Sequence, residues 1–262
     1  MMGSLLLRGM LVGVLAGLIA FGFARVFGEP AVDAAIAVEA AAGDGHSHSH
    51  SHGTTTESTA TAEPAAEEEE LVSRETQAGW GLLTGTVVFG AAVGGIFALV
   101  FAFAYGRVGR LDARATSLLL ALGAFVALAI VPQLKYPANP PAVGSGETIG
   151  ERTQLFFAFL LISVIALTLA VMLARRLWAR TGGWNAGILG GALYLVLIAI
   201  GAAVLPAGDP VPEGFPAQVL WDFRVATWGI QAILWAVIGL GFGLLAESRM
   251  AQRDAGRRLA YR

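Results

Sequence analysis

Long stretches without a charged residue constrain this chain more than any other feature. Five of them occur, at residues 79–106, 115–134, 153–174, 181–208 and 225–246. As a helix, each is long enough to cross a hydrocarbon layer of about 30 Å. A sixth apolar stretch, 5–24, contains only Arg8, which lies near enough to its start to reach the lipid–water boundary. The pattern predicts an all-α, polytopic transmembrane helical bundle with six spans.

Composition excludes the soluble alternatives. Hydrophobic residues make up 56% of the 262 residues and charged residues only 14%, which leaves too little polar surface to cover a soluble core and too much apolar surface for a disordered chain. The chain has no Cys, so disulfides, thiolate metal sites and cysteine nucleophiles are excluded. A small-residue stripe of Gly9, Gly13 and Gly17 indicates close helix–helix packing in the first span.

The arginines predict the orientation. If six spans alternate, eleven arginines fall on one side: Arg107, Arg110, Arg114, Arg175, Arg176, Arg180, Arg249, Arg253, Arg257, Arg258 and Arg262. Because positive residues collect on the cytoplasmic side, both termini are expected in the cytoplasm and the chain is expected as a multi-pass protein of the cytoplasmic (inner) membrane. In an alternative interpretation the first span is a cleaved signal peptide, which would leave five spans and the same loop placement.

The spans divide the chain into regions. We expect a first transmembrane helix at 1–27, an extracytoplasmic disordered loop rich in His and Glu at 28–77, a five-helix transmembrane region at 78–246 and a basic cytoplasmic tail at 247–262. Within the third region, Pro-rich outer loops are expected at 132–152 and 206–223. Arg74, Arg152 and Arg224 each follow a Pro-containing outer loop and precede a span. This recurrence suggests three related helical hairpins, with chance matching of short apolar segments as the alternative.

The first outer loop carries the clearest metal-binding signal. All four histidines of the chain alternate with serine there: His46, His48, His50 and His52. Alternate residues of an extended chain point to one side, so several imidazoles can bind one divalent cation. Eleven carboxylates and one arginine between residues 28 and 77 give the loop a net charge of −10 (1 − 11), which attracts cations. The pattern indicates affinity for Co, Ni, Cu or Zn without choosing among them, and a solvated tract with incidental affinity is the alternative.

Polar residues at the outer helix ends are candidates for a cation path or gate. They are Glu29, Lys135, Tyr136, Asn139, Glu151, Arg152, Asp222 and Arg224. Several lie near the Pro-rich segment 131–141, which is expected to form a stiff extended strap because proline fixes φ and removes a donor. Thr148 and Glu151 have the spacing of a capping box, and Arg152 in the same first turn is expected to need a carboxylate partner. Structural ion pairs and interfacial anchors are the alternative interpretation of these residues.

Three segments resemble a known family. They are KYPANPPAVGSGETIGERT at 135–153, FGEP at 27–30 and FPAQVLWDFR at 215–224. Together they are similar to CbtA, the integral-membrane subunit of a probable cobalt transporter. The resemblance implies Co²⁺ uptake, a link to cobalamin synthesis, and a small single-span partner subunit with a His-rich motif, CbtB. Descriptions of the family give about five spans, whereas this sequence predicts six.

The predicted function is therefore a membrane subunit of a transition-metal uptake transporter, with cobalt as the expected substrate and Ni²⁺ or Zn²⁺ as alternatives. No permanently bound cofactor and no nucleic-acid partner are expected. The expected partners are the lipid bilayer, a CbtB-like subunit and a possible second copy of the chain. The sequence has no GxxxxGK[ST] phosphate loop, so the chain itself is not expected to hydrolyse ATP. The alternatives are a metal-binding membrane sensor or scaffold, and a membrane enzyme, for which no nucleophile–base motif is seen.

Overall fold

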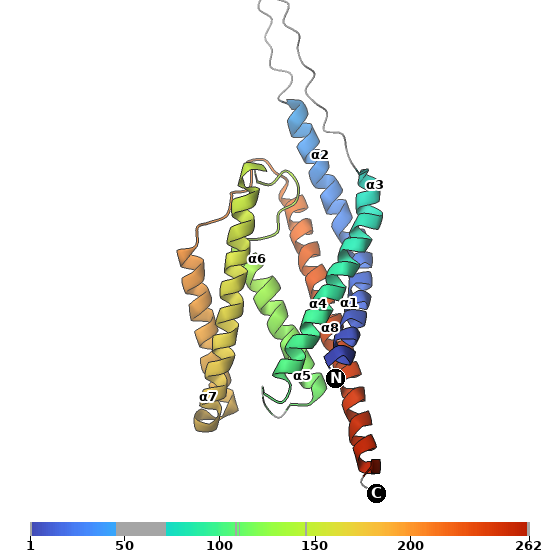
Figure 1. The fold of residues 1–262 in the computed structure, drawn as a ribbon. Coiled ribbons are helices and arrows are strands. Elements are labelled where there is room, and N and C mark those ends of the chain that lie inside the picture. The colour runs from blue at the N-terminus through green and yellow to red at the C-terminus, as the bar shows by residue number, and fades with distance from the viewer. Residues whose placement is uncertain (1, 46–71, 108, 110, 145, 261–262) are drawn as a thin grey trace, which may run out of the picture.

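The computed structural model describes residues 2–45, 72–107, 109, 111–144 and 146–260. Within these residues every regular element is helical, and the helices run roughly side by side as a bundle (Figure 1). The predicted all-α fold is thus confirmed for the part of the chain that the structure describes.

The first helix is longer than the sequence predicts. It comprises α1 (Met2–Phe23), a π-helical segment η1 (Ala24–Gly28) and α2 (Glu29–Gly45). We expected a disordered loop from residue 28, but residues up to Gly45 are helical. Alanine, the strongest helix former, dominates α2, and Ala31 and Ala35 are buried against neighbouring elements. The remainder of the expected loop, 46–71, lies outside the described residues.

The second helix packs tightly against the first. It comprises α3 (Arg74–Thr76), the π-helical segment η2 (Gln77–Gly81) and α4 (Leu82–Ala104). A Cβ atom added to Gly13 would lie 2.0 Å from the carbonyl oxygen of Gly90. The backbones of α1 and α4 therefore approach as closely as glycine alone permits, which confirms the packing role predicted for the glycine stripe.

The third helix changes neighbours along its length. It begins as α5 (Ala113–Ala124), passes through η3 (Phe125–Ile130), another π-helical segment, and ends as α6 (Val131–Lys135). The side chain of Asp112 caps its start by accepting a hydrogen bond of 2.7 Å from the N–H of Ala115. α5 packs on α8, whereas α6 packs on α7.

α7 (Ile149–Val204), preceded by the short 3-10 helix η4 (Gly146–Thr148), crosses the bundle twice. A single crossing of about 30 Å needs about 20 residues, and α7 has 56. The chain reverses at Gly182, whose φ of 76° and ψ of 161° form a backbone conformation that is essentially restricted to glycine. The two legs then pack together, and the hydroxyls of Ser163 and Tyr194 meet across them at 2.8 Å.

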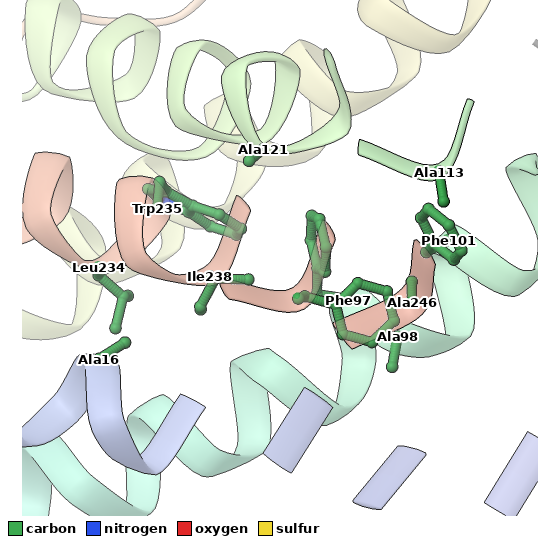
Figure 2. Packing of buried hydrophobic residues seen from close by; sticks show 11 residues of the cluster. Ala16, Phe97, Ala98, Phe101, Ala113, Ala121, Leu234, Trp235, Ile238 and Ala246 are labelled. Atoms are coloured by element: carbon green, nitrogen blue, oxygen red, sulfur yellow. The ribbon is translucent and has the colours of Figure 1, made fainter. Parts of the chain in front are cut away.

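Within the described residues, five helices are long and apolar enough to cross a membrane, and one of them, α7, folds back on itself. Counting the two legs of α7 separately, this agrees with the six spans that the uncharged stretches predict. α8 (Ala217–Ala260) is the last, and it packs on α1 and α5. Trp235 and Ile238 of α8 belong with Phe97 and Phe101 of α4 to one buried cluster (Figure 2). Phe242 of α8 belongs to the same cluster, and its ring lies 5.0 Å from the ring of Phe101.

Both described ends of the chain lie at the same end of the bundle, and the Pro-rich loops lie at the other (Figure 1). We call the second the outer end, after the orientation predicted from the arginines. Exposed tryptophans lie near both ends of the bundle. Trp80 and Trp221 lie toward the outer end, and Trp178 and Trp184 lie beside the turn of α7. Such amphipathic rings favour the membrane–water interface, so their placement agrees with a bundle embedded in a bilayer.

The suggested three hairpins do not pack alike. The first pair, α1 and α4, is in close contact along its length, and α6 contacts α7. The third pair would join the second leg of α7 to α8, yet α8 packs instead on α1 and α5. A common origin of the three hairpins stays a prediction, and equivalent packing about a shared centre is not seen.

Candidate functional site

The extended strap predicted for 131–141 begins only at Tyr136, because residues 131–135 are helical as α6 in spite of Pro132. We keep the name strap for residues 136–144, which follow α6 and join the outer loops. At its start Tyr136 turns out of the helix and donates a hydrogen bond of 2.7 Å from its hydroxyl to the carbonyl of Pro206. The preceding Lys135 donates from Nζ to the carbonyl of Leu205 at 3.2 Å. Burial raises the pKa of the Tyr136 hydroxyl, so this group stays protonated and remains a donor. Both contacts tie the strap to the end of α7.

A second set of bonds ties the strap to α8. Arg224 donates from Nε to the carbonyl of Ala138 at 3.3 Å and from Nη2 to Oδ1 of Asn139 at 2.9 Å. The strap is therefore held on one side by α7 and on the other by α8, two elements that do not pack closely on each other in the described part of the chain. Four of the predicted path residues take part in these hydrogen bonds between the strap, α7 and α8: Lys135, Tyr136, Asn139 and Arg224.

Arg152 has the carboxylate partner that its position requires. Its Nε lies 3.6 Å from Oδ2 of Asp209, and its Nη1 donates to the carbonyl of Val143 at 3.2 Å. The need for a partner was predicted, but Asp209 was not among the candidates. Its signal in the sequence is a carboxylate placed between Gly208 and Pro210 in the second Pro-rich loop.

The capping-box spacing marks the start of α7 correctly, since Thr148 is its N-cap residue, but the expected capping hydrogen bond is wrong because the Thr148 side chain makes none. Its hydroxyl donates to Oδ2 of Asp209 at 2.5 Å, a charge-assisted hydrogen bond to the second Pro-rich loop. Glu151, the expected reciprocal partner, is exposed to solvent.

A shallow hollow opens to the outside between the two Pro-rich loops. It is lined by Gly144, Thr148, Asp209, Pro210 and Pro212. Because the Asp209 carboxylate is already opposed by the guanidinium of Arg152, the hollow is a mixed-charge surface rather than a ready cation site.

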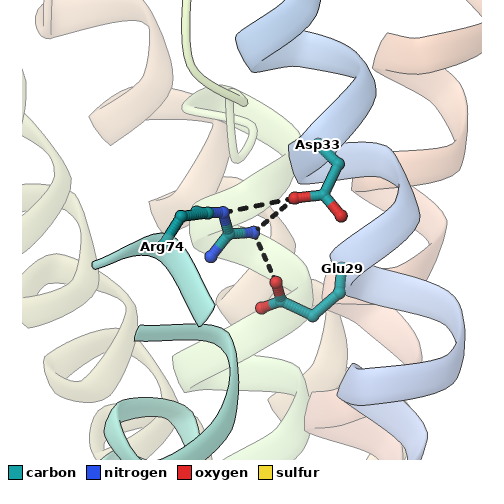
Figure 3. A network of polar contacts seen from close by, with 3 residues as sticks. All are labelled: Glu29, Asp33 and Arg74. Carbon is teal, nitrogen blue, oxygen red and sulfur yellow. Dashed lines mark hydrogen bonds and ion pairs between the residues drawn. The ribbon is translucent and has the colours of Figure 1, made fainter. Parts of the chain in front are cut away.

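Arg74 forms a separate ion-pair cluster at the base of the first outer loop (Figure 3). Its guanidinium pairs with the carboxylate of Glu29 and donates to Oδ1 of Asp33, from Nη2 at 2.9 Å and from Nε at 3.2 Å. Glu29 is only 7% exposed, so the pair neutralises a buried charge. Glu29 was predicted as a path residue, and Asp33 was not; the cluster fixes α2 against α3.

The remaining candidates lie at the surface. Asp222 is exposed and accepts a hydrogen bond of 2.7 Å from Gln218, one turn earlier on α8. Glu151 is exposed at the start of α7. The structure thus gathers Lys135, Tyr136, Asn139, Arg152 and Arg224 around the strap and leaves these two carboxylates outside it.

No metal cluster is visible in the part of the chain that the structure describes. Within it, no three His, Asp or Glu side chains come close enough together to hold a metal ion. The predicted metal ligands His46, His48, His50 and His52 lie outside the described residues, so the metal site in the first outer loop stays a prediction.

Comparison with known proteins identifies the family. No curated protein and no solved structure matches the chain. A family model described as "Probable cobalt transporter subunit (CbtA)" matches residues 2–247, from α1 through the membrane part of α8 and including the strap. The chain therefore belongs to the CbtA family of probable cobalt transporter subunits.

Proposed function

We propose that this chain is the subunit of a cobalt uptake system through which the divalent cation crosses the membrane. The observation that supports it most is a match to a transporter-subunit family across nearly all of a chain that folds as a bundle of apolar spans. The energy requirement agrees with transport without ATP, because an inside-negative potential of about 100 mV favours entry of a doubly charged ion by about 4.6 kcal/mol.

In this proposal the His tract collects cations outside the membrane. His46 directly follows Gly45, the last residue of α2. The 17 residues of α2 extend over about 26 Å at about 1.5 Å per residue, and the helix rises beyond the outer loops (Figure 1). Capture should weaken as the pH falls through about 6.5, where imidazole becomes protonated and no longer donates a lone pair.

The strap would act as the outer gate. Four side-chain hydrogen bonds connect it to the end of α7 and to α8, one each from Lys135 and Tyr136 and two from Arg224. The Arg152–Asp209 ion pair leaves 28% and 31% of the two side chains exposed, and pairs of this kind contribute about 1 kcal/mol or less. Contacts this weak can open and close at little energetic cost, as a gate requires.

A small single-span, His-rich subunit of the CbtB type is the proposed partner, and the cytoplasmic membrane with both termini inside is the proposed location. The transported cation is substrate, and no resident cofactor or catalytic residue is proposed. Cobalt is the first choice because of the family description, and nickel and zinc are the competitors that imidazole ligands also accept.

Uptake of radioactive cobalt, nickel and zinc tests the proposal. Cells expressing the chain with the small partner should accumulate cobalt above cells that carry an empty vector, with cobalt preferred over the other two metals. Cells that bind metal at the surface without accumulating it would instead support a sensor or scaffold. Absence of accumulation both with and without the partner would contradict the transporter proposal.

Replacement of the four histidines by alanine tests the collecting role separately. The variant His46→Ala/His48→Ala/His50→Ala/His52→Ala should take up less cobalt at low external metal and nearly as much as the parent at high metal. Replacement of the interleaved serines by alanine is the matched control, since it keeps the imidazoles. Loss of uptake at every cobalt concentration would show that the tract is part of the path.

A further inference from the structure

The membrane part of the bundle offers a cation no charged ligand. The five long stretches that form the spans contain no Asp, Glu or His. A cation that passes between these helices can therefore meet only neutral oxygen atoms of hydroxyl groups, side-chain amides and backbone carbonyls. Such atoms bind a cation most readily where no hydrogen-bond donor already occupies their lone pairs.

Most buried polar side chains of the spans are already satisfied. Ser117 donates to the carbonyl of Gly239 at 2.7 Å, and Ser163 pairs with Tyr194 at 2.8 Å. Gln133 differs from them. It is 8% exposed, and its Oε1 atom has no hydrogen-bond partner among the described residues. A buried amide oxygen without a donor costs about 1–3 kcal/mol, which calls for an explanation.

The backbone beside Gln133 is also short of donors. The N–H of Val131 donates to the carbonyl of Val126, which lies five residues earlier in η3. In a regular α-helix this hydrogen bond would reach back only four residues. The next residue, Pro132, is fully buried and has no N–H, so it cannot supply the bond to the carbonyl of Ala127 that would follow. π-helical turns inside α-helices are frequently found at functional sites.

Gln133 lies in α6, which directly follows η3 along the same helix. Helical side chains lean toward the N-terminal turn, so the amide of Gln133, a residue of α6, leans back toward η3. Lys135, two residues later, lies on a nearly opposite face of the helix, and its ammonium group is directed to Leu205 on α7. Its positive charge therefore does not fill the position beside Oε1.

We propose that Gln133 Oε1 is a ligand of a coordination site for a partly hydrated divalent cation, directly beneath the strap. The site deepens the proposed function and rests on it as the first binding step inside the membrane. Neutral oxygen ligands bind a divalent ion more weakly than imidazoles and carboxylates, and they suit hard cations. A cation can therefore leave such a site again, which conduction requires.

Cobalt uptake by Gln133→Leu tests the site, because leucine keeps much of the volume and removes the acceptor. At limiting cobalt, uptake should fall about tenfold, as for the loss of one ligand to a charged group. Gln231→Leu is the matched control, since Gln231 is an amide on α8 that is only half-buried, and it should keep parental uptake. Gln133→Glu should lower the KM for cobalt and slow turnover, because a carboxylate holds the ion more tightly. Parental kinetics in both Gln133 variants would overturn the site while leaving the transporter proposal intact.

A binding measurement tests the site independently of transport. In the purified full chain with the four histidines replaced by alanine, Mn²⁺ is the probe, because it favours oxygen ligands and its free form is measured directly by electron paramagnetic resonance. Weak Mn²⁺ binding should persist in this background, disappear with Gln133→Leu and remain with Gln231→Leu. Absence of Mn²⁺ binding in the background protein, or its persistence in Gln133→Leu, would overturn the site. Failure of the parent to transport cobalt would instead overturn the proposed function.

Discussion

Gly144 is the most tightly specified single residue of the strap. Its φ of +95° lies in the region that favours glycine, and a Cβ atom there would lie 2.2 Å from Nη1 of Arg152. Gly144→Ala should therefore destabilise the protein by about 2 kcal/mol or more, through backbone strain and displacement of the guanidinium. Thermal unfolding in detergent measures this loss of stability. Gly146→Ala is the control, since a Cβ there meets nothing within 4 Å, and an equal effect of both variants would contradict this account.

The partner of Arg152 can be tested by a double-mutant cycle. Arg152→Gln and Asp209→Asn should each lower stability, and together they should cost less than the sum, with a coupling energy of about 0.5–1 kcal/mol for a half-exposed pair. Asp222→Asn should show no coupling to Arg152→Gln, because the Asp222 carboxylate bonds Gln218 on its own helix. Coupling to Asp222 and none to Asp209 would show that the outer loops are arranged differently.

At the residue scale, the sequence predicts the chemical kind of partner that a side chain needs better than it predicts which residue that partner is. The unfavourable position of Arg152 at a helix start predicts a carboxylate, and the structure supplies Asp209. The choice of Asp209 over Glu29 or Asp222 depends on how two loops far apart in the sequence meet, which local rules do not determine. The same limit applies to Thr148, which makes no side-chain capping hydrogen bond and donates to Asp209 in a loop that is distant in the sequence.

At the scale of helices, the contact of α1 with α4 gives the clearest prediction. A Cβ atom at Gly13 would lie 2.0 Å from the Gly90 carbonyl oxygen, so Gly13→Ala must push the two backbones apart. We expect a loss of at least about 2 kcal/mol of stability, seen as a lower Tm in detergent. Gly22→Ala, on the same helix with nothing within 4 Å, should be neutral or slightly stabilising because alanine favours helix. Equal destabilisation by both variants would count against a close α1–α4 contact.

The helix elements are the best-predicted part of this protein. Most of each uncharged stretch lies within a helix, because only a segment that satisfies its own backbone can cross lipid. Two features depart from the simplest pattern. Helix α2 continues past Gly28 since its alanine-rich sequence both favours helix and packs against neighbours. The turn between the two legs of α7 is so tight that Gly182 alone has non-helical backbone angles.

At the scale of the whole molecule, the termini should lie on the side opposite the strap. Because the chain has no Cys, single cysteines can be introduced without background. Ala207→Cys, beside the strap, should react with a membrane-impermeant maleimide in intact cells, whereas Ser4→Cys and Ser248→Cys should react only after the membrane is opened. Labelling of Ser4→Cys or Ser248→Cys in intact cells would contradict the orientation predicted from the arginines.

The packing of whole helices could not be read from the sequence. Apolar stretches show which segments cross the membrane, but lipid-facing and helix-facing residues are similarly apolar, so no amphipathic pattern reveals the neighbours of a span. The placement of α8 on α1 and α5 is an example. The proposed Gln133 site was missed for the same reason, since its significance depends on burial and on the missing donor.

Cobalt influx into liposomes tests the central claim, passage of a divalent cation through this bundle, most directly. The purified chain is reconstituted with its small partner subunit, and an inside-negative potential is imposed with a potassium gradient and valinomycin. We predict that cobalt accumulates inside well above the level in protein-free liposomes and that accumulation rises with the imposed potential. Cobalt levels equal to those of protein-free liposomes at every potential would contradict the account.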